Sequence, residues 1–150
     1  PDRVSSTVFV DAWVLLDGER INDVLPAELV AAVAGMAEAS PDNSVTMPVE
    51  LWRTAFMHDG SEELYRVIEP RLVPSPFGWL DEPIELRSSE ASSIPAGYVF
   101  LEQDRSVPQE VFHTAAGRLK DPRVATAPGS HEAMLTRPKE LAHALMSVLA

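Results

Sequence analysis

The sequence predicts an α/β fold in which a small parallel sheet of about three strands is flanked by helices and interrupted by a helical cap insertion. Three short runs of β-branched and aromatic residues alternate with amphipathic helical patterns, which is typical of parallel sheets covered by helices. The long stretch between the first and second runs has helical periodicity over much of its length. A length of 150 residues and a hydrophobic fraction of 45% are sufficient for one domain with an apolar core.

The first strand is predicted over residues 7–10, which read Thr-Val-Phe-Val and favour a buried strand. A turn-like stretch at 15–20 follows it. A helix is then predicted over 25–39, because Pro26 suits a first helical turn and apolar residues recur behind it at helical spacing. These apolar residues are Leu29, Val30, Val33 and Met36.

Two further short helices are predicted within residues 48–76, separated by a His-Asp-Gly turn at 58–60 and ended by prolines. The stretch 40–44 reads as a loop. The Pro- and Ser-rich stretch 77–95 is predicted to be irregular. The insertion is therefore expected to be helical at its centre and irregular where it returns to the sheet.

The second strand has its predicted core at residues 98–101, and a helix is predicted over 108–120 after a short loop. The third strand is predicted at 124–126, where a Pro-Gly pair ends it. The final helix begins at Pro138, which suits a first helical turn. One of its faces carries Leu141, Leu145, Val148 and Leu149.

These elements divide the chain into three segments. Residues 1–16 form the first core strand and its turn, residues 17–93 form the helical cap insertion, and residues 94–150 form the C-terminal core. A parallel sheet of so few strands is thin, since such sheets ordinarily have both faces and more neighbours buried. An unpaired strand edge at residues 7–10 would make the chain prone to aggregation without a partner.

Composition excludes several classes of function. A net charge of −11 argues against a nucleic acid or an anionic membrane as partner, because both require clustered Lys and Arg. Cysteine is absent, so disulfides and thiolate chemistry are excluded, and the four histidines lack metal-ligand spacing. We therefore expect no metal and no cofactor. No apolar run has the length of a membrane span and no secretory leader pattern is present, which favours a soluble, cytoplasmic protein.

Two side chains that follow neighbouring strands are candidate catalytic residues. Asp104 comes after the second predicted strand, and His131 lies in the loop between the third strand and the final helix. In open α/β sheets, ligands bind beyond the carboxyl ends of the strands, so both side chains are expected to reach the same space. An aspartate that accepts from one imidazole nitrogen would leave the other nitrogen free as a general base.

Each of these residues also has an ordinary structural reading. His131 could be a surface histidine in a polar loop. Asp104 could be a turn residue before the following helix, for which Ser106 and Gln109 resemble a capping box.

The residues around this pair resemble a known family. "VFLEQDRSVP" followed by "APGSHEAMLTRPKELAHAL" is similar to the C-terminal end of the α/β-hydrolase superfamily, whose triad runs in the order nucleophile, acid, histidine. "RVSSTVFVDAWVLLDGERINDVLP" resembles the strand after the nucleophile and the start of the lid, and "AFMHDGSEELYRVIEPRLVPSP" resembles a helical cap. The chain is most similar to the branch of plant hydroxynitrile lyases, plant methyl esterases and small bacterial esterases. The resemblance implies that Asp104 is the triad acid and His131 the triad histidine.

The nucleophile expected from this resemblance is missing. No G-x-S-x-G turn occurs in the chain, and Ser130, next to His131, reads as a turn residue. The chain therefore resembles the C-terminal half of an α/β-hydrolase. One hypothesis is that a companion polypeptide with the N-terminal half supplies the serine and the oxyanion donors for hydrolysis of a small apolar ester or lactone.

The second hypothesis is a non-hydrolytic α/β-hydrolase-like protein, such as a cyclase, a lyase or a ligand-binding scaffold subunit. The missing nucleophile motivates it. Cyanohydrin cleavage is disfavoured, because the lyases of the branch carry a lysine after the histidine where this chain has Glu132. Glu132 can equally be a solvent-facing loop residue.

Large apolar side chains gather in and around the insertion. The resemblance implies that the cap covers the active site, so Trp13, Trp52, Phe56 and Trp79 are predicted to contact the substrate. The alternative for each is packing of the cap onto the sheet. The pair His58–Asp59 is expected to cap the helix that follows it, and His113 and His143 read as ordinary helix positions.

Overall fold

The computed structural model describes residues 3–86 and 94–149. Its central sheet has three parallel strands in the order β1, β4, β5. The strands are β1 (Thr7–Val10), β4 (Ala96–Leu101) and β5 (Arg123–Ala127). This arrangement confirms the α/β class and the three strands expected from the sequence.

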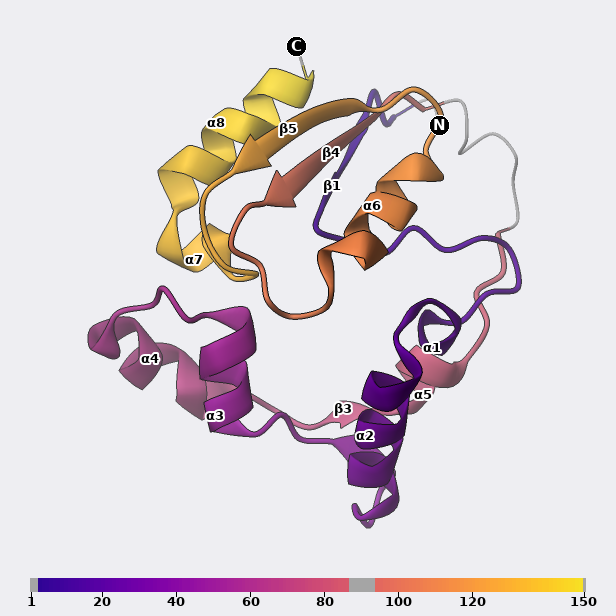
Figure 1. Ribbon diagram of the computed structural model, residues 1–150, viewed down its shortest axis with the longest axis vertical. Coiled ribbons are helices and arrows are strands. Elements are labelled where there is room, and N and C mark those ends of the chain that lie inside the picture. The colour runs from indigo at the N-terminus through magenta and orange to yellow at the C-terminus, as the bar shows by residue number, and fades with distance from the viewer. Residues whose placement is uncertain (1–2, 87–93, 150) are drawn as a thin grey trace.

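The sheet lies between helices, as Figure 1 shows. Helix α8 (Pro138–Leu149) covers one face, and helix α6 (Gln109–Gly117) covers the other. Because side chains alternate along a strand, β1 and β4 contribute to both cores, whereas β5 contributes to the core under α8. The core under α8 contains Val8, Val10, Val99, Leu101, Ala125, Ala127, Leu141, Ala144 and Val148. The core under α6 contains Phe9, Tyr98, Phe100, Phe112, Ala115 and Ala116.

The cap is formed by the chain between β1 and β4, and it lies on the side of the sheet toward which the carboxyl ends of the strands point (Figure 1). Its helical elements are α1 (Ile21–Val24), α2 (Ala27–Glu38), α3 (Val49–Leu51), a π-helical turn (Trp52–Phe56), α4 (Glu62–Ile68), a 3₁₀ turn (Glu69–Arg71) and α5 (Gly78–Asp81). Its own small core contains Trp52, Met57 and Tyr65.

Several short elements differ from the expectation. An antiparallel pair joins β2 (Ser44–Val45), at the end of the loop predicted at 40–44, to β3 (Ser75–Pro76), at the end of the segment predicted to hold two short helices. Helices α1 and α5, and α7 (Ala133–Thr136) before α8, are single turns that were not predicted, because elements this short carry no periodicity. Part of the stretch 77–95 lies outside the described residues. The three segment boundaries stay a prediction.

Ion pairs tie the start of the cap to the sheet domain. The Arg118 guanidinium at the end of α6 donates to Glu19 Oε2 at 2.8 Å and Oε1 at 3.0 Å, and also to the carbonyl of Val14 at 2.7 Å. A two-pronged contact of this kind fixes orientation as well as distance.

Among the described residues, no helix combines the length and the apolar character that crossing a bilayer requires.

Gly97 tests the packing of α8 on the sheet. A Cβ atom at Gly97 would lie 2.8 Å from Val148 Cγ2 and 2.9 Å from its Cβ, so Gly97→Ala should lower the free energy of unfolding by about 1 to 3 kcal/mol. The control is Gly35→Ala in α2, where no atom lies within 4 Å and alanine should be neutral or stabilising by up to about 1 kcal/mol. Denaturant unfolding measures both, and equal stabilities of the two variants would contradict this packing.

Candidate active site

The two predicted catalytic side chains meet at the carboxyl edge of the sheet. Asp104 follows β4 and His131 follows β5, and these strands are adjacent and parallel with Leu101 opposite Ala127. Asp104 Oδ2 lies 2.6 Å from His131 Nδ1. The Asp104 side chain is 0% exposed and that of His131 is 32% exposed. The structure therefore brings the two predicted side chains into direct contact.

The Asp104 carboxylate is held by its own loop. Its Oδ1 accepts from the backbone N–H of Ser106 at 2.7 Å, and Gln109 Nε2 donates to the Asp104 carbonyl at 3.0 Å. The expected capping box is wrong, because Pro108 occupies the N-cap position and has no side-chain acceptor. Ser106 Oγ instead lies 3.2 Å from His131 Nδ1. Ser106 and Gln109 therefore support the acid rather than the helix.

The histidine loop is held by the cap. Ser130 Oγ donates to Asp59 Oδ1 at 2.6 Å, and the backbone N–H of Glu132 donates to the carbonyl of Phe56 at 3.0 Å. The Phe56 ring meets the His131 ring edge-on, with centroids 5.4 Å apart. Ser130 is a turn residue, as expected, and in addition a fully buried link between the loop and the cap.

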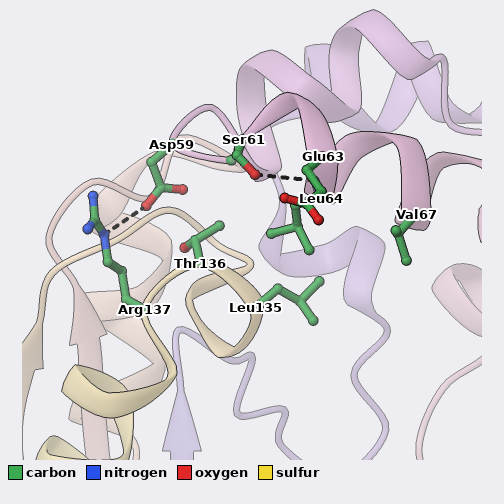
Figure 2. Close-up of a pocket in the computed structure, with 9 residues that line it drawn as sticks. Asp59, Ser61, Glu63, Leu64, Val67, Leu135, Thr136 and Arg137 are labelled. Atoms are coloured by element: carbon green, nitrogen blue, oxygen red, sulfur yellow. Dashed lines mark hydrogen bonds and ion pairs between the residues drawn. The ribbon is translucent and has the colours of Figure 1, made fainter.

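The expectation that His58 and Asp59 cap helix α4 is wrong. Ser61 caps it by accepting from the backbone N–H of Leu64, as Figure 2 shows. His58 Nε2 instead contacts the carbonyl of Gln103 in the Asp104 loop at 2.8 Å. In Figure 2, Asp59 points toward Arg137, whose Nε lies 3.5 Å from Asp59 Oδ2. Both residues of this pair therefore join the cap to the loops that carry Asp104 and His131.

Figure 2 shows the polar pocket that opens beside this junction, with a volume of about 420 Å³. It lies between α4 and the α7 segment and contains neither Asp104 nor His131. We therefore assign it no part in the predicted chemistry.

The pair carries opposite pKa shifts. Burial disfavours the charged form of Asp104, but the hydrogen bond and charge of His131 outweigh burial and hold the Asp104 pKa below its usual range. Burial likewise disfavours imidazolium, but the Asp104 hydrogen bond and charge outweigh it and raise the pKa of His131. The carboxylate therefore stabilises a protonated imidazole, which is the state that a general base reaches after it takes a proton.

His131 lines an apolar cavity of about 270 Å³ between the sheet and the cap. Side chains from both parts form the walls, and none of them other than His131 is ionisable. The walls include Trp13, Leu25, Leu29, Val33, Met36, Met47, Leu51, Phe56, Trp79, Leu80, Val107 and Phe112. An apolar cavity with one reactive polar group is the usual form of a small-molecule site.

Three of the four predicted substrate-contacting aromatics lie at this cavity. They are Trp13, Phe56 and Trp79, and the rings of Trp13 and Trp79 are 6.1 Å apart. The placement of Trp52 corrects the expectation, because it is 4% exposed and packs edge-on against Tyr65 inside the cap. Periodicity could not separate these positions, because a residue packed inside the cap and a residue facing the cavity have the same apolar character.

Among the described residues, the site holds a candidate base and a candidate acid, and no serine contacts His131 Nε2. Serines at the cavity wall are Ser75 and Ser106, and Ser106 contacts the same imidazole nitrogen that Asp104 occupies. In the described part of the chain, no three His, Asp or Glu side chains form a cluster that could hold a metal ion. The arrangement can accept and return a proton at the cavity.

Sequence reasoning missed a second acidic side chain at the strand ends, Asp11. It follows β1 directly, is 3% exposed, and accepts from the backbone N–H of Leu101 at 3.0 Å. The signal was present, because the rule that selects Asp104 and His131 at strand ends also selects Asp11. The Asp59–Ser130 link left no comparable signal, since it joins residues far apart in the sequence.

Solved structures resemble this chain along its whole length. An extracellular α/β-hydrolase from a Paenibacillus species, described as sharing structural and functional homology with tobacco salicylic acid binding protein 2, matches with a TM-score of 0.88 and 29% identity. This match covers 99% of this chain and 63% of that one. Polyneuridine aldehyde esterase matches with a TM-score of 0.76 and 20% identity, covering 100% of this chain and 64% of that one.

The methylesterase MES16 from Arabidopsis matches with a TM-score of 0.75 and 17% identity, covering 99% of this chain and 60% of that one. No family model and no curated protein matches the sequence. The chain thus has an α/β-hydrolase fold, its neighbours are of the kind expected from the sequence, and it spans less than two thirds of their length. That partial coverage fits the C-terminal half.

The ion pair predicts a pH dependence. His131 should titrate above its usual range, and Asp104→Asn should lower its pKa because the negative charge is lost. Since the folded pKa is raised, the stability that His131 gains from the pair is fully present below 6.5 and is lost as the pH rises through the raised pKa. Imidazole proton NMR measures the titration. The control Asp42→Asn removes an exposed carboxylate that binds Ser40, and should leave His131 unchanged.

Proposed function

We propose that this chain supplies the base and the acid of a Ser-His-Asp triad for hydrolysis of carboxylic esters or lactones. The observation that carries the proposal is the 2.6 Å contact between His131 Nδ1 and the buried Asp104 carboxylate, at the wall of an apolar cavity. Hydrolases and esterases among the structural neighbours support it.

In the proposed mechanism, His131 Nε2 takes the proton of a serine hydroxyl while the oxygen attacks the ester carbonyl. Asp104 keeps Nδ1 protonated and stabilises the imidazolium. His131 then returns the proton to the leaving alcohol as the carbon–oxygen bond breaks, which leaves an acyl-enzyme. Water, deprotonated by the same imidazole, releases the acid and restores the serine.

The nucleophile comes from outside these 150 residues, which contain no G-x-S-x-G turn. We propose that a companion polypeptide with the N-terminal half carries the serine and the oxyanion donors. Within the described sheet, β1 pairs with β4 alone, so its other edge can accept a strand of the companion. A longer chain carrying both halves would form the same triad.

The cavity indicates the class of substrate. A volume of about 270 Å³ with aliphatic and aromatic walls suits the acid or ring part of a small to medium, uncharged ester or lactone. A charged group would lose its hydration there without a partner. Glu132 beside His131 adds a negative charge, which disfavours release of a cyanide anion.

The second candidate is a non-hydrolytic protein of the same fold, a cyclase, lyase or ligand-binding scaffold that uses the cavity without a serine. The absence of a nucleophile beside His131 among the described residues favours it. A cytoplasmic location, and the exclusion of nucleic acid and membrane partners, stay predictions from composition.

Replacement of His131 tests the proposed base. His131→Ala in the assembled protein should reduce turnover of an apolar p-nitrophenyl ester by about 10³-fold or more, because the serine loses its base. His143→Ala, an exposed histidine of α8, is the matched control and should retain turnover. Unchanged turnover in His131→Ala with an intact assembly would contradict the triad.

A covalent label locates the nucleophile. A serine-directed phosphonate should modify the assembled protein once, and intact mass under denaturing conditions should place the adduct on a polypeptide other than this 16.4 kDa chain. One larger species with the adduct would indicate a single longer chain. An assembly that binds apolar esters but takes no label would favour the non-hydrolytic candidate.

A further inference from the structure

Asp11 is a buried acidic residue that the proposed mechanism does not use. It ends β1 at the carboxyl edge of the sheet, is 3% exposed, and has a positive φ of 31°. Its Oδ2 accepts from the backbone N–H of Leu101, while Oδ1 is fully buried and finds no donor among the described residues. A non-glycine residue in this backbone region is strained, and such strain is often found at functional sites.

The Asp104 side chain lies close enough to Asp11 to raise the Asp11 pKa through hydrogen bonding and through its charge. Two carboxylates can only accept, so a hydrogen bond between them requires one proton. Asp11 Oδ1 is the oxygen available to carry it, because Oδ2 already accepts from an amide. Burial of a carboxylate without a donor would otherwise be costly.

The surroundings decide which of the two holds the proton. Asp104 faces the His131 ring and accepts from the N–H of Ser106, and both contacts favour its charged form. Asp11 has one amide donor and no cation in direct contact. Burial, the largest cause, together with the hydrogen bond and charge of Asp104, raises the pKa of Asp11 to about 8. The proton therefore belongs on Asp11 at neutral pH.

We infer that Asp11 is a positioning residue, which stays protonated and donates a hydrogen bond from Oδ1 to the Asp104 carboxylate. Through this bond it fixes the orientation of the acid that holds His131. The effect of Asp11 on turnover rests on the proposed function. The protonation of Asp11 beside Asp104 does not depend on that function.

A neutral Asp11 also limits the charge beside the base. Two carboxylates there would raise the pKa of His131 further and keep the imidazole protonated, so that it could not act as a base at neutral pH. The titratable groups that interact with Asp11 are Asp104, His131 and Tyr98, and burial raises the pKa of Tyr98 above its usual range, so it stays neutral. Glu132 adds a negative charge near His131. The second carboxylate charge appears only as Asp11 ionises in alkaline solution.

The test follows the Asp11 carboxyl carbon by NMR in the assembled protein labelled with [4-¹³C]aspartate, assigned by loss of its signal in Asp11→Asn. The expected midpoint lies near pH 8, and His131 should show a second inflection at the same pH. A midpoint below about 5, near the usual aspartate value, would overturn the inference.

The variants separate a positioning role from a structural one. An asparagine at 11 can accept from Leu101 and donate to Asp104, so Asp11→Asn should leave the main titration of His131 unchanged and abolish the inflection near pH 8. If Asp11 were ionised instead, Asp11→Asn would lower the His131 pKa, which would refute the inference. Asp17→Asn is the control, since Asp17 also accepts from a backbone N–H, that of Leu86, but is exposed.

Measurements of ester turnover test whether Asp11 affects function. Asp11→Asn should keep most of the turnover at pH 6 to 7, whereas Asp11→Leu, which has no donor, should lose about tenfold or more. Equal turnover of both variants would contradict the positioning role. If no variant and no wild-type protein hydrolyses esters, the proposed function fails, while the NMR titration still decides whether Asp11 shares its proton.

Discussion

The parallel pairing of β4 with β5 is the constraint on which the site depends. It places Leu101 beside Ala127, so the loops that follow the two strands leave the sheet at the same edge and at the same height. Neither loop could bring Asp104 to 2.6 Å from His131 without that register. Apolar packing of α8 on one face and α6 on the other holds the register, because a slip by one residue would turn each strand's buried side chains to the wrong face.

The cap contributes to the site in two ways that share the same contacts. It provides most of the cavity wall, and it holds the loops that carry Asp104 and His131. The contacts are Asp59 with Ser130, the Phe56 carbonyl with Glu132, and His58 with the Gln103 carbonyl. A cap movement that opened the cavity would also loosen the loop that carries His131. Cavity access and orientation of the predicted base are thereby coupled in this fold.

Electrostatics at the site are governed by burial. The surface is strongly acidic, with a net charge of −11, yet the cavity walls carry no charged side chain besides the histidine. A fully buried carboxylate at Asp104 is stable as an anion because the imidazole and the Ser106 amide compensate its lost hydration. Asp11, with fewer donors and the same burial, is driven in the opposite direction. Two chemically identical groups thus take different protonation states from their surroundings alone.

Residue patterns along the chain were sufficient for the α/β class and for the three parallel strands, and they selected Asp104 and His131, whose side chains the structure brings into contact. These features follow from local periodicity and from the geometric rule that parallel strands end at one edge of a sheet. The tertiary structure decided the rest. Trp52 packs inside the cap, whereas Trp13 and Trp79 reach the cavity. Ser106 supports the acid instead of a helix, and Asp59 binds Ser130. The proton on Asp11 belongs to the same group. Each of these depends on contacts between residues distant in sequence and on burial, neither of which leaves a periodic trace in the chain.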